Sequence, residues 1–290
     1  MLLISAIVTG LAVGSMYGLI ALGYHVTYVV SNTVNFSQGS SMMLGAVLGY
    51  TFAIRLGWPL PFAVFTALLL CALFGLAVER FLVRPFAERG SNSWLMATVA
   101  GGIVLDNVVL FTFGKEPRAF PSILAQQPIK LFGAGVFPLQ LVIPLVGIGI
   151  AVVLSLVLNR TRLGKAMLAV VQNKDAARLM GINVRTAIAL SFALSTALAG
   201  LAGLLIAPLF SVHSDMGTLF GIKAFAVAIL GGITSATGVI LAGFLYGLIE
   251  ALVTALVGST YTQIAAFAVV ILALAVMPSG LLGRAAAKKV

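Results

Sequence analysis

The amino-acid sequence predicts an all-α polytopic membrane protein with about eight transmembrane helices, within a range of seven to nine. Of its 290 residues, 61% are apolar and only 8% are charged, whereas soluble domains carry about 25% charged residues. Apolar runs such as residues 60–78 approach the roughly 20 residues that a helix needs to cross a bilayer. Open strands cannot span lipid, because their backbone groups would remain unpaired there. We therefore expect a single transmembrane domain over residues 1–290.

The expected membrane segments follow one another along the chain, separated by short polar connections. Seven of them are simple apolar runs, at residues 3–30, 42–54, 60–78, 94–113, 139–158, 187–206 and 263–277. A further segment, residues 221–257, is too long for one simple span and is interrupted by the glycine-rich stretch 231–238. We expect two pieces there, which form either two crossings or a re-entrant pair.

The basic residues predict the orientation of these segments. Of the 17 Lys and Arg residues, three lie in residues 79–92, which we expect to form a charged loop, six in residues 159–185 and three in the C-terminal tail (Arg284, Lys288 and Lys289). These connections are separated by even numbers of spans, and cytoplasmic loops are enriched in Lys and Arg. The sequence therefore predicts a cytoplasmic C-terminus, with the N-terminus and the loop 114–137 outside.

A probable internal repeat with interrupted helices is also visible. Residues 11–85 contain a glycine-bearing helix, a polar break at 31–41, a second glycine-bearing helix and a helix that ends near Arg84. Residues 221–284 follow the same order around the break at 231–238. Internal repeats with interrupted helices recur in transporters, whose substrate path lies where the repeats meet. A chance similarity between two glycine-rich segments is the alternative.

Several function classes are excluded by what the sequence lacks. The basic residues are scattered through loops rather than forming a stripe with aromatic residues, which argues against a nucleic-acid partner. No Walker ATP-binding loop, zinc-protease motif or nucleophile elbow is present. The single Cys71 and the two distant histidines offer no metal site. We expect no catalytic activity, no metal and no cofactor of the chain's own, so energy for active transport would come from elsewhere.

Polar residues inside the membrane segments are the candidates for a substrate pathway. Uncharged polar residues can interrupt a helix at membrane depth only where they line a cavity or pack in protein. Free N–H groups at such breaks favour a carboxylate and free carbonyls favour an ammonium group, so a zwitterion would suit them. The pathway candidates are Asn32, Asn35, Ser37, Gln38, Asp106, Asn107, Thr234 and Ser235.

Each of these candidates has a plainer interpretation. The 31–41 break could equally be an ordinary interfacial turn. Asp106 lies in the middle of its run beside Asn107, and a membrane-buried acid is either a structural partner in the bundle or part of a pathway. Lys223 and Glu250 are better interpreted as interfacial residues, because a long side chain near a helix end can reach water.

The most charged connection, residues 159–185, contains the sequence of a short capped helix at 173–181. Asn173 can cap its N-terminus, Asp175 lies in the first turn, where the helix dipole favours an acid, and Gly181 suits the position after the last turn. Before it, Leu163, Met167, Val170 and Val171 follow helical spacing. A solvated connector would need neither caps nor an apolar stripe, so we expect an ordered segment that meets a protein partner.

The same segment resembles the coupling motif of ABC-importer permeases. Asp175-Ala176-Ala177, followed after three residues by Gly181, is similar to the EAA---G signature of these proteins, with Asp in place of Glu. The resemblance implies that the 173–181 helix, including Arg178, docks on a cytoplasmic ATPase. The Ile-x-Leu-Pro that completes the fuller signature is absent.

Further stretches resemble the branched-chain amino acid permeases among these importers. The opening helix leads into Asn35-Phe36-x-x-Gly39 and then Met43-Leu44-Gly45-Ala46, as in that family. The family often has Ala-His where this chain has Ser37-Gln38. The stretches ARLMGINV, FALSTALAGLAG, GVILAGFLYGLIE and MPSGLLG also match, so the resemblance covers nearly the whole chain.

This resemblance implies the membrane subunit of an ATP-driven importer for branched-chain or other hydrophobic amino acids, in a bacterial cytoplasmic (inner) membrane. Its implied partners are two ABC ATPase subunits, which would use the ATP, a second permease chain that is a paralogue or a copy, and an extracytoplasmic substrate-binding protein. Related permeases for urea or short amides, a stand-alone ion-coupled carrier and a channel-like protein remain as alternatives. A lone carrier would not need the capped 173–181 helix.

Overall fold

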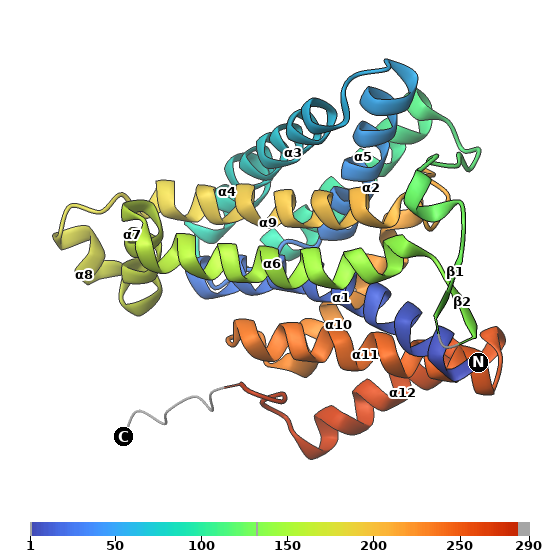
Figure 1. Ribbon diagram of the computed structural model, residues 1–290. Coiled ribbons are helices and arrows are strands. Elements are labelled where there is room, and N and C mark those ends of the chain that lie inside the picture. The colour runs from blue at the N-terminus through green and yellow to red at the C-terminus, as the bar shows by residue number, and fades with distance from the viewer. Residues whose placement is uncertain (1, 132, 284–290) are drawn as a thin grey trace.

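Two long helices, α1 (Leu2–Ser31) and α9 (Val184–Ile206), lie side by side at the centre of the molecule. The other long helices pack around this pair (Figure 1). The structure is a computed structural model that describes residues 2–131 and 133–283. More than half of the apolar stretch of each central helix is buried inside the protein, whereas the peripheral helices turn most of their surface outward. Small residues of α1 and α9, such as Gly23 and Gly200, allow neighbouring helices to approach the central pair closely.

The remaining elements are mostly helical. Two of the helices continue into short π-helical turns, and the described residues include a small antiparallel hairpin before α6 and an isolated antiparallel bridge between Arg118 and Val212. Their bounds are α2 (Gln38–Tyr50), η1 (Thr51–Arg55), α3 (Leu60–Ala77), η2 (Val78–Val83), α4 (Arg84–Ala87), α5 (Trp94–Phe113), η3 (Ile123–Ala125), β1 (Ile129–Leu131), β2 (Ala134–Val136), α6 (Pro138–Arg160), α7 (Arg162–Gln172), α8 (Lys174–Leu179), α10 (Met216–Gly231), α11 (Ala236–Leu256) and α12 (Ser259–Val276).

The structure confirms the predicted fold class. Within the described residues, seven helices are long and apolar enough to cross a membrane, and α10 is a shorter apolar helix. The continuous helix formed by α2 and η1 is another short segment. The expected segment 221–257 does divide into two pieces, which are the short helix α10 and the full-length α11. The chain is therefore a multi-pass helical membrane protein.

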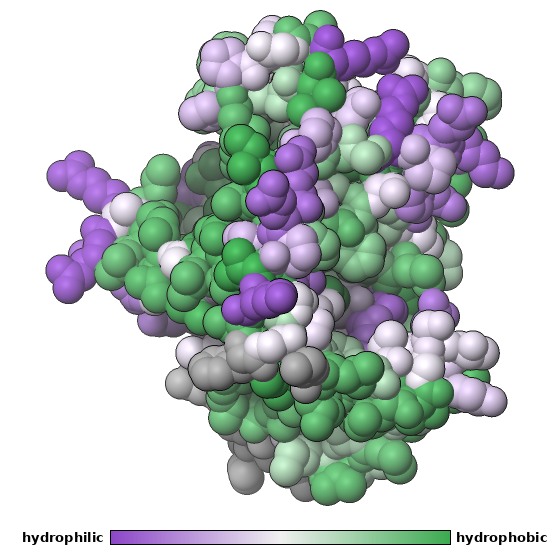
Figure 2. Space-filling model, turned by 45° about the vertical axis from the view of Figure 1, so that its right-hand side comes forward, coloured by the Kyte–Doolittle hydropathy of each residue, from purple (hydrophilic) through white to green (hydrophobic). Residues whose placement is uncertain are grey.

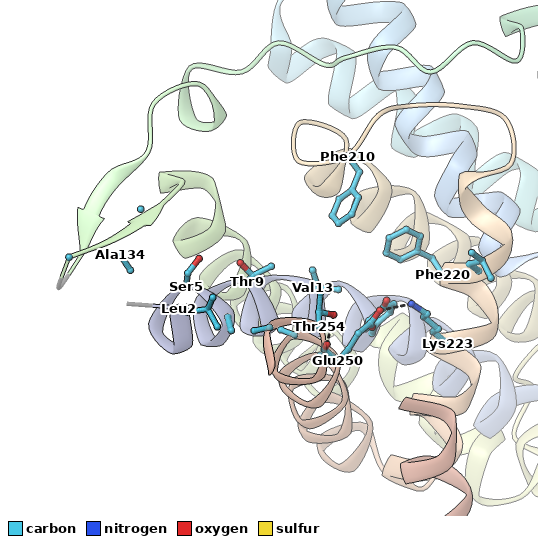
Figure 3. A pocket seen from close by; sticks show the side chains of 18 residues that line it. Leu2, Ser5, Thr9, Val13, Ala134, Phe210, Phe220, Lys223, Glu250 and Thr254 are labelled. Carbon is cyan, nitrogen blue, oxygen red and sulfur yellow. Dashed lines mark hydrogen bonds and ion pairs between the residues drawn. The ribbon is translucent and has the colours of Figure 1, made fainter. Parts of the chain in front are cut away.

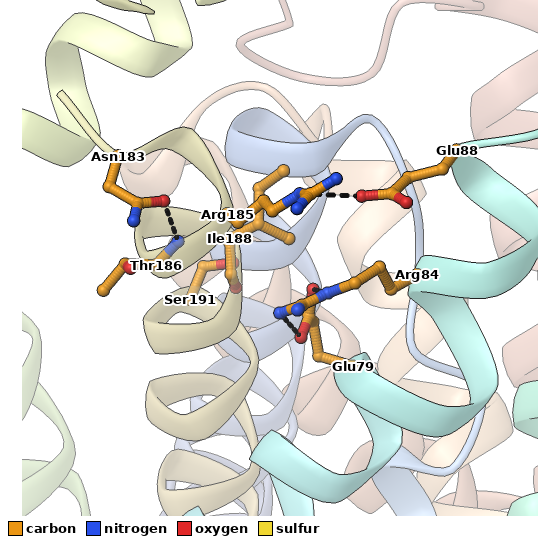
Figure 4. Close-up of polar contacts among 8 residues, drawn as sticks. All are labelled: Glu79, Arg84, Glu88, Asn183, Arg185, Thr186, Ile188 and Ser191. Carbon is orange, nitrogen blue, oxygen red and sulfur yellow. Dashed lines mark hydrogen bonds and ion pairs between the residues drawn. The ribbon is translucent and has the colours of Figure 1, made fainter. Parts of the chain in front are cut away.

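The connections lie at two opposite ends of the bundle. The N-terminal end of α1 and the β1–β2 hairpin lie at one end, and α4, α7 and α8 lie at the other (Figure 1). At that second end Arg185 forms a 2.9 Å ion pair with Glu88 (Figure 4). The basic connections 79–92 and 159–185 therefore share one end, as predicted. The basic tail residues Arg284, Lys288 and Lys289 lie outside the described residues, and which end faces the cytoplasm stays a prediction.

The prediction of a loop from residue 79 onward is wrong over its first part. The helix that begins as α3 continues through η2 and α4 to Ala87. Arg84 explains this extension, because its guanidinium donates two hydrogen bonds, of 3.0 and 2.6 Å, to the buried carboxylate of Glu79 (Figure 4). A bidentate pair of this kind neutralises the acid inside the protein, so these charged residues fit into a helix.

The outer surface of the bundle is suited to lipid. Large apolar side chains on α3, α5, α6 and α12 are exposed, for example Phe65, Phe111, Leu145 and Ile271. Figure 2 shows broad hydrophobic areas on the surface, with hydrophilic residues gathered in groups between them. A soluble protein rarely exposes such large apolar patches, which supports burial of this surface in a bilayer.

Candidate functional site

The polar break after α1 leads the chain back into the core. α1 ends at Ser31, and Asn32 has a left-handed backbone (φ 63°) while its N–H bonds the carbonyl of Tyr28. Asn tolerates this conformation better than most residues. The chain then returns until Gln38, at the start of α2, donates a 2.9 Å hydrogen bond to the carbonyl of Ser195, halfway along α9. The chain therefore re-enters the bundle after α1, and the depth of this break in the membrane stays a prediction.

Three of the predicted pathway residues form a closed network in this break. Asn35, Ser37 and Gln38 are fully buried. The side-chain oxygen of Asn35 accepts hydrogen bonds from the N–H and hydroxyl of Ser37, and Ser195 donates a 3.0 Å bond to Gln38 and a 2.8 Å bond to the carbonyl of Gly23. Their polar groups are used inside the protein, so these residues hold the break in place, and none of them is among the residues that line the two cavities described below.

Two short helices begin next to each other in the middle of the bundle. α2 and α10 approach so closely that a Cβ on Gly39 would lie 2.3 Å from the carbonyl oxygen of Gly217, and a Cβ on Gly217 would lie 2.2 Å from that of Gly39. Only glycine fits at this crossing. The first turn of a helix carries N–H groups without intrahelical partners, so two positive helix ends meet at this depth.

A cavity of about 230 Å³ lies beside this crossing. It is lined by the starts of α2 and α10, by one side of α5 and by aromatic residues. Phe225 packs against Tyr24 and Phe36 at ring-centroid distances of 5.4 and 5.0 Å. The lining residues are Tyr24, Phe36, Gly39, Ser40, Val99, Gly102, Ile103, Asp106, Thr218, Gly221, Ile222 and Phe225.

The neighbours Asp106 and Asn107 have different surroundings. Asp106 lines this cavity, and its Oδ1 is buried without a hydrogen-bond partner among the described residues. Asn107 is exposed on the outside of α5 and donates a 2.8 Å hydrogen bond to the carbonyl of Ile103 in its own helix. The prediction of a pathway role therefore agrees with the place of Asp106, which lines the cavity, and not with that of the Asn107 side chain, which faces outward from this chain.

The second predicted break, at 231–238, is of a different kind. It is a short turn between α10 and α11 at the end of the bundle that also carries α7 and α8 (Figure 1). Thr234 is exposed, and the hydroxyl of Ser235 caps α11 by accepting a hydrogen bond from the N–H of Gly238. The structure therefore separates these two pathway candidates from Asp106. α10 is preceded by the connection 207–215, in which Phe210, Ser211 and Asp215 are exposed, and the predicted repeat stays a prediction.

A larger cavity, of about 870 Å³, lies between α1, α10 and α11 (Figure 3). Lys223 and Glu250 line it and form a 2.5 Å ion pair, with side chains that are only 10% and 16% exposed. The expectation that these two residues are interfacial is wrong. Each of them was recognisable as an ionisable residue in an apolar run, but 27 positions separate them, and no local pattern pairs residues at that distance.

The capped helix in the connection 159–185 is confirmed as α8. The side chain of Asn173 accepts hydrogen bonds of 3.0 Å from the N–H groups of Asp175 and Ala176. Gly181 has a left-handed backbone (φ 80°) and ends the helix as predicted. Ala177 is buried against the bundle, while Asp175 and Arg178 are exposed and form a 3.6 Å ion pair.

The apolar residues of this connection divide into two groups. Met167 and Val170 of α7 are buried in a cluster with Val26 and Leu154, so part of the predicted stripe packs within the chain. Leu163, Leu179 and Met180 are 65%, 90% and 81% exposed. The tip of α8 thus presents apolar side chains beyond the bundle, next to exposed charges.

α8 is connected directly to the polar break. The ammonium group of Lys174 donates a 2.9 Å hydrogen bond to the carbonyl of Ser31, the last residue of α1. Burial, with a smaller contribution from Arg178, lowers the pKa of Lys174. A displacement of α8 would therefore act on the point where α1 ends and the break begins.

Comparisons with known proteins agree with this arrangement. Residues 6–275 match the family model described as "Branched-chain amino acid transport system / permease component". The chain is 33% identical over 294 aligned residues to the high-affinity branched-chain amino acid transport system permease protein LivH of Escherichia coli K12, covering 97% of this chain and 96% of LivH. It is also 33% identical to BraD of Pseudomonas aeruginosa, the corresponding high-affinity permease protein, covering 98% and 97%.

Among solved structures, PsaBC from Streptococcus pneumoniae in complex with Fab aligns with a TM-score of 0.49 and 12% identity, covering 92% of this chain and 90% of that one. The chain belongs to the family of branched-chain amino acid transport system permease components.

Proposed function

We propose that this chain is the membrane-spanning subunit of an ATP-driven ABC importer that moves branched-chain or other hydrophobic amino acids into the cytoplasm. One observation carries the mechanical part of the proposal. α8 is capped at both ends, places Leu179 and Met180 outside the bundle and bonds α1 through Lys174. A membrane protein that works alone has no need of such an exposed apolar tip, whereas a docking partner would cover it.

The docking partner we propose is an ABC ATPase. Two ATPase subunits would bind and hydrolyse the ATP, because the chain has no nucleotide-binding motif of its own. Their closure would move α8 together with the neighbouring end of α9, which Arg185 ties to Glu88. The movement would reach the polar break through Lys174 and Ser31, and a two-state bundle would then change the side to which it opens.

The substrate pathway we propose passes the cavity beside the crossing of α2 and α10. The paired helix N-termini favour the carboxylate of an amino acid, and Asp106 offers a negative partner for its ammonium group. The rings of Tyr24, Phe36 and Phe225 would close the cavity toward the end that carries α8. Because this cavity lies at one side of a single chain, a second permease chain, a paralogue or a copy, would complete the pathway.

The remaining partners follow from the same scheme. An extracytoplasmic substrate-binding protein would deliver the amino acid to the end that carries the loop 114–137 and the connection 207–215. The membrane would be a bacterial cytoplasmic membrane, with α8 on the cytoplasmic side. The relatives LivH and BraD are described as permeases for branched-chain amino acids, which supports this substrate class over urea or a short amide.

Site-directed crosslinking tests the docking role. The native Cys71 is buried, so it is replaced by Ser, and single cysteines are introduced by Met180→Cys on α8 and by Gln126→Cys in the exposed loop at the opposite end. In the assembled complex we expect a bifunctional thiol reagent to join the cysteine at position 180 to the ATPase and the cysteine at 126 not to join it. An ATPase crosslink from 126 alone would contradict the docking role and the predicted orientation.

A further inference from the structure

The Lys223–Glu250 pair lies deep in the membrane part of the protein. Lys223 follows Gly221, which packs against Gly39 at the crossing of the two short helices. From Leu2 at the mouth to Tyr17 near the pair, the cavity follows α1 for about 15 residues, or roughly 22 Å of helix. The pair therefore sits at the inner end of a cavity whose mouth is at the end with the β1–β2 hairpin (Figure 3).

The polar groups of this pair are incompletely satisfied. The Nζ of Lys223 donates to Oε1 of Glu250 and lies 5.8 Å from the ring centroid of Tyr17. Oε2 of Glu250 is buried and has no hydrogen-bond partner among the described residues. A buried ion pair is favourable only when its remaining donors and acceptors are also bonded, so the site has unused capacity for a polar ligand.

The walls of the cavity restrict what this ligand can be. They are mainly apolar, with Val13, Phe210, Leu219 and Phe220 among them, and Ser5, Thr9 and Thr254 add hydroxyl groups. A volume of about 870 Å³ is in the range of small-molecule sites. A phospholipid that entered at the mouth would bring its acyl chains against the ion pair, which is unfavourable.

We propose that this cavity is a binding site for a hydrophobic α-amino acid in its zwitterionic form, separate from the smaller cavity beside Asp106. The carboxylate binds Lys223, the ammonium group binds Glu250, and the apolar side chain lies against Phe210 and Phe220. The site rests on the proposed function, since it holds the same class of substrate. It is a second binding site on the side of α10 opposite the smaller cavity, and it is reached from the end with the hairpin.

Direct binding of labelled leucine tests the site. The probe is tritiated leucine, added to the complete permease–ATPase complex in nanodiscs without the substrate-binding protein. We expect Lys223→Met and Glu250→Gln each to weaken binding about tenfold or more, the effect of losing one charge-assisted contact. Leucinamide, which lacks the carboxylate, and 4-methylpentanoate, which lacks the amine, should each compete poorly. Arg55→Met, which removes an exposed cation outside the cavity, should leave binding unchanged.

A double exchange, Lys223→Glu with Glu250→Lys, distinguishes a binding site from a structural pair. The ion pair itself is restored, so thermal stability should recover, but the charges face the wrong ends of a ligand whose side chain is fixed by the aromatic wall. We expect leucine binding to stay weak. Wild-type affinity in the exchanged protein would overturn the proposal, and so would unchanged binding in both single variants or no binding to the wild type at millimolar leucine.

ATP-driven uptake, measured after the same proteins are reconstituted into proteoliposomes with the binding protein present, separates the two proposals. Uptake by the wild type together with leucine binding that is insensitive to both single variants rejects the site alone. If the wild type shows no ATP-driven uptake, the proposed function fails, whatever the binding result. Replacing phosphatidylethanolamine by phosphatidylcholine in the nanodiscs should not change leucine binding, and a dependence on phosphatidylethanolamine would assign the site to a lipid headgroup instead.

Discussion

The ammonium group of Lys174 donates a 2.9 Å hydrogen bond to the carbonyl of Ser31, which joins the first residue of α8 to the last residue of α1. A helix end has carbonyl groups without intrahelical partners, and a cation is favourable there. The contact therefore stabilises the end of α1 and connects the proposed docking helix with the break that begins at Asn32.

Removing this contact should weaken coupling without preventing docking. In Lys174→Met the methylene groups remain but the hydrogen bond is lost, so we expect ATP hydrolysis by the complex to persist and uptake per ATP to fall several-fold. The measurement is leucine uptake and phosphate release in the same proteoliposomes. Arg55→Met is the control for loss of an exposed cation, and an uptake-to-hydrolysis ratio like that of the wild type would argue against the link.

Changes in the caps of α8 should uncouple the importer more strongly. Gly181→Pro cannot adopt the positive φ at this position, and Asp175→Arg places a cation at a helix N-terminus. Both proteins should still insert in the membrane, because neither residue is in the core, but uptake should fall about tenfold or more while ATP hydrolysis becomes independent of substrate. Arg55→Met, which alters an exposed residue outside the proposed docking surfaces, provides the control. Normal uptake in both α8 variants would count heavily against docking.

The crossing of α2 and α10 should not accept a larger residue than glycine. Gly39→Ala places a methyl group 2.3 Å from the carbonyl oxygen of Gly217, and overpacking of this kind costs about 1–3 kcal/mol. We expect a lower thermal unfolding temperature in detergent. Gly149→Ala in α6 is the matched control, because no atom lies within 4 Å of the added group, and it should be neutral or stabilising by up to about 1 kcal/mol. Equal stability of the two variants would show that the crossing of α2 and α10 has room for an added methyl group.

Gln38 should prove to be structural. The sequence made Gln38 a pathway candidate, but the buried network predicts a structural role for this side chain. The variant Gln38→Leu removes the hydrogen bonds that Gln38 makes with the hydroxyl and the carbonyl of Ser195 inside the protein, which costs about 1–3 kcal/mol, so the yield and thermal stability of the protein should fall together with uptake. A stable protein with a selective loss of uptake would restore the pathway role of this side chain.

Asp106 and Asn107 provide a test of the pathway itself. Asp106→Asn keeps the shape of the side chain but removes the charge that faces the cavity, and we expect about tenfold lower uptake, because one charge-assisted contact is lost. Asn107→Leu removes only a hydrogen bond within α5 and should have little effect. The measurement is ATP-driven uptake with protein amounts normalised, and the reverse order of effects would place the pathway on the outer face of α5.

Much of the fold was predictable because it depends on local pattern. The apolar runs predicted the long helices, and Asn173 and Gly181 predicted both ends of α8, since caps act within a few residues of the helix they terminate. The extension of α3 to Ala87 was missed because it depends on the pairing of Arg84 with Glu79 inside the protein, and composition alone made this segment look like a loop.

The site was harder to predict, because its residues meet only in three dimensions. The polar break identified Asn35 and Gln38 as candidates, but whether they face a cavity or each other depends on Ser195 of α9, 157 residues after Gln38. The pairing of Lys223 with Glu250 likewise depends on the antiparallel packing of α10 and α11. Polar residues in apolar runs thus identified some positions of interest without revealing their partners.

Uptake in a fully reconstituted system tests the central claim most directly. Proteoliposomes would contain this chain, its second permease chain and the two ATPase subunits, with the binding protein and labelled leucine added at the side opposite α8. The proposed function predicts uptake that requires ATP on the α8 side and is unaffected when the proton gradient is dissipated. Uptake that persists without ATP, or that follows the proton gradient, would contradict it.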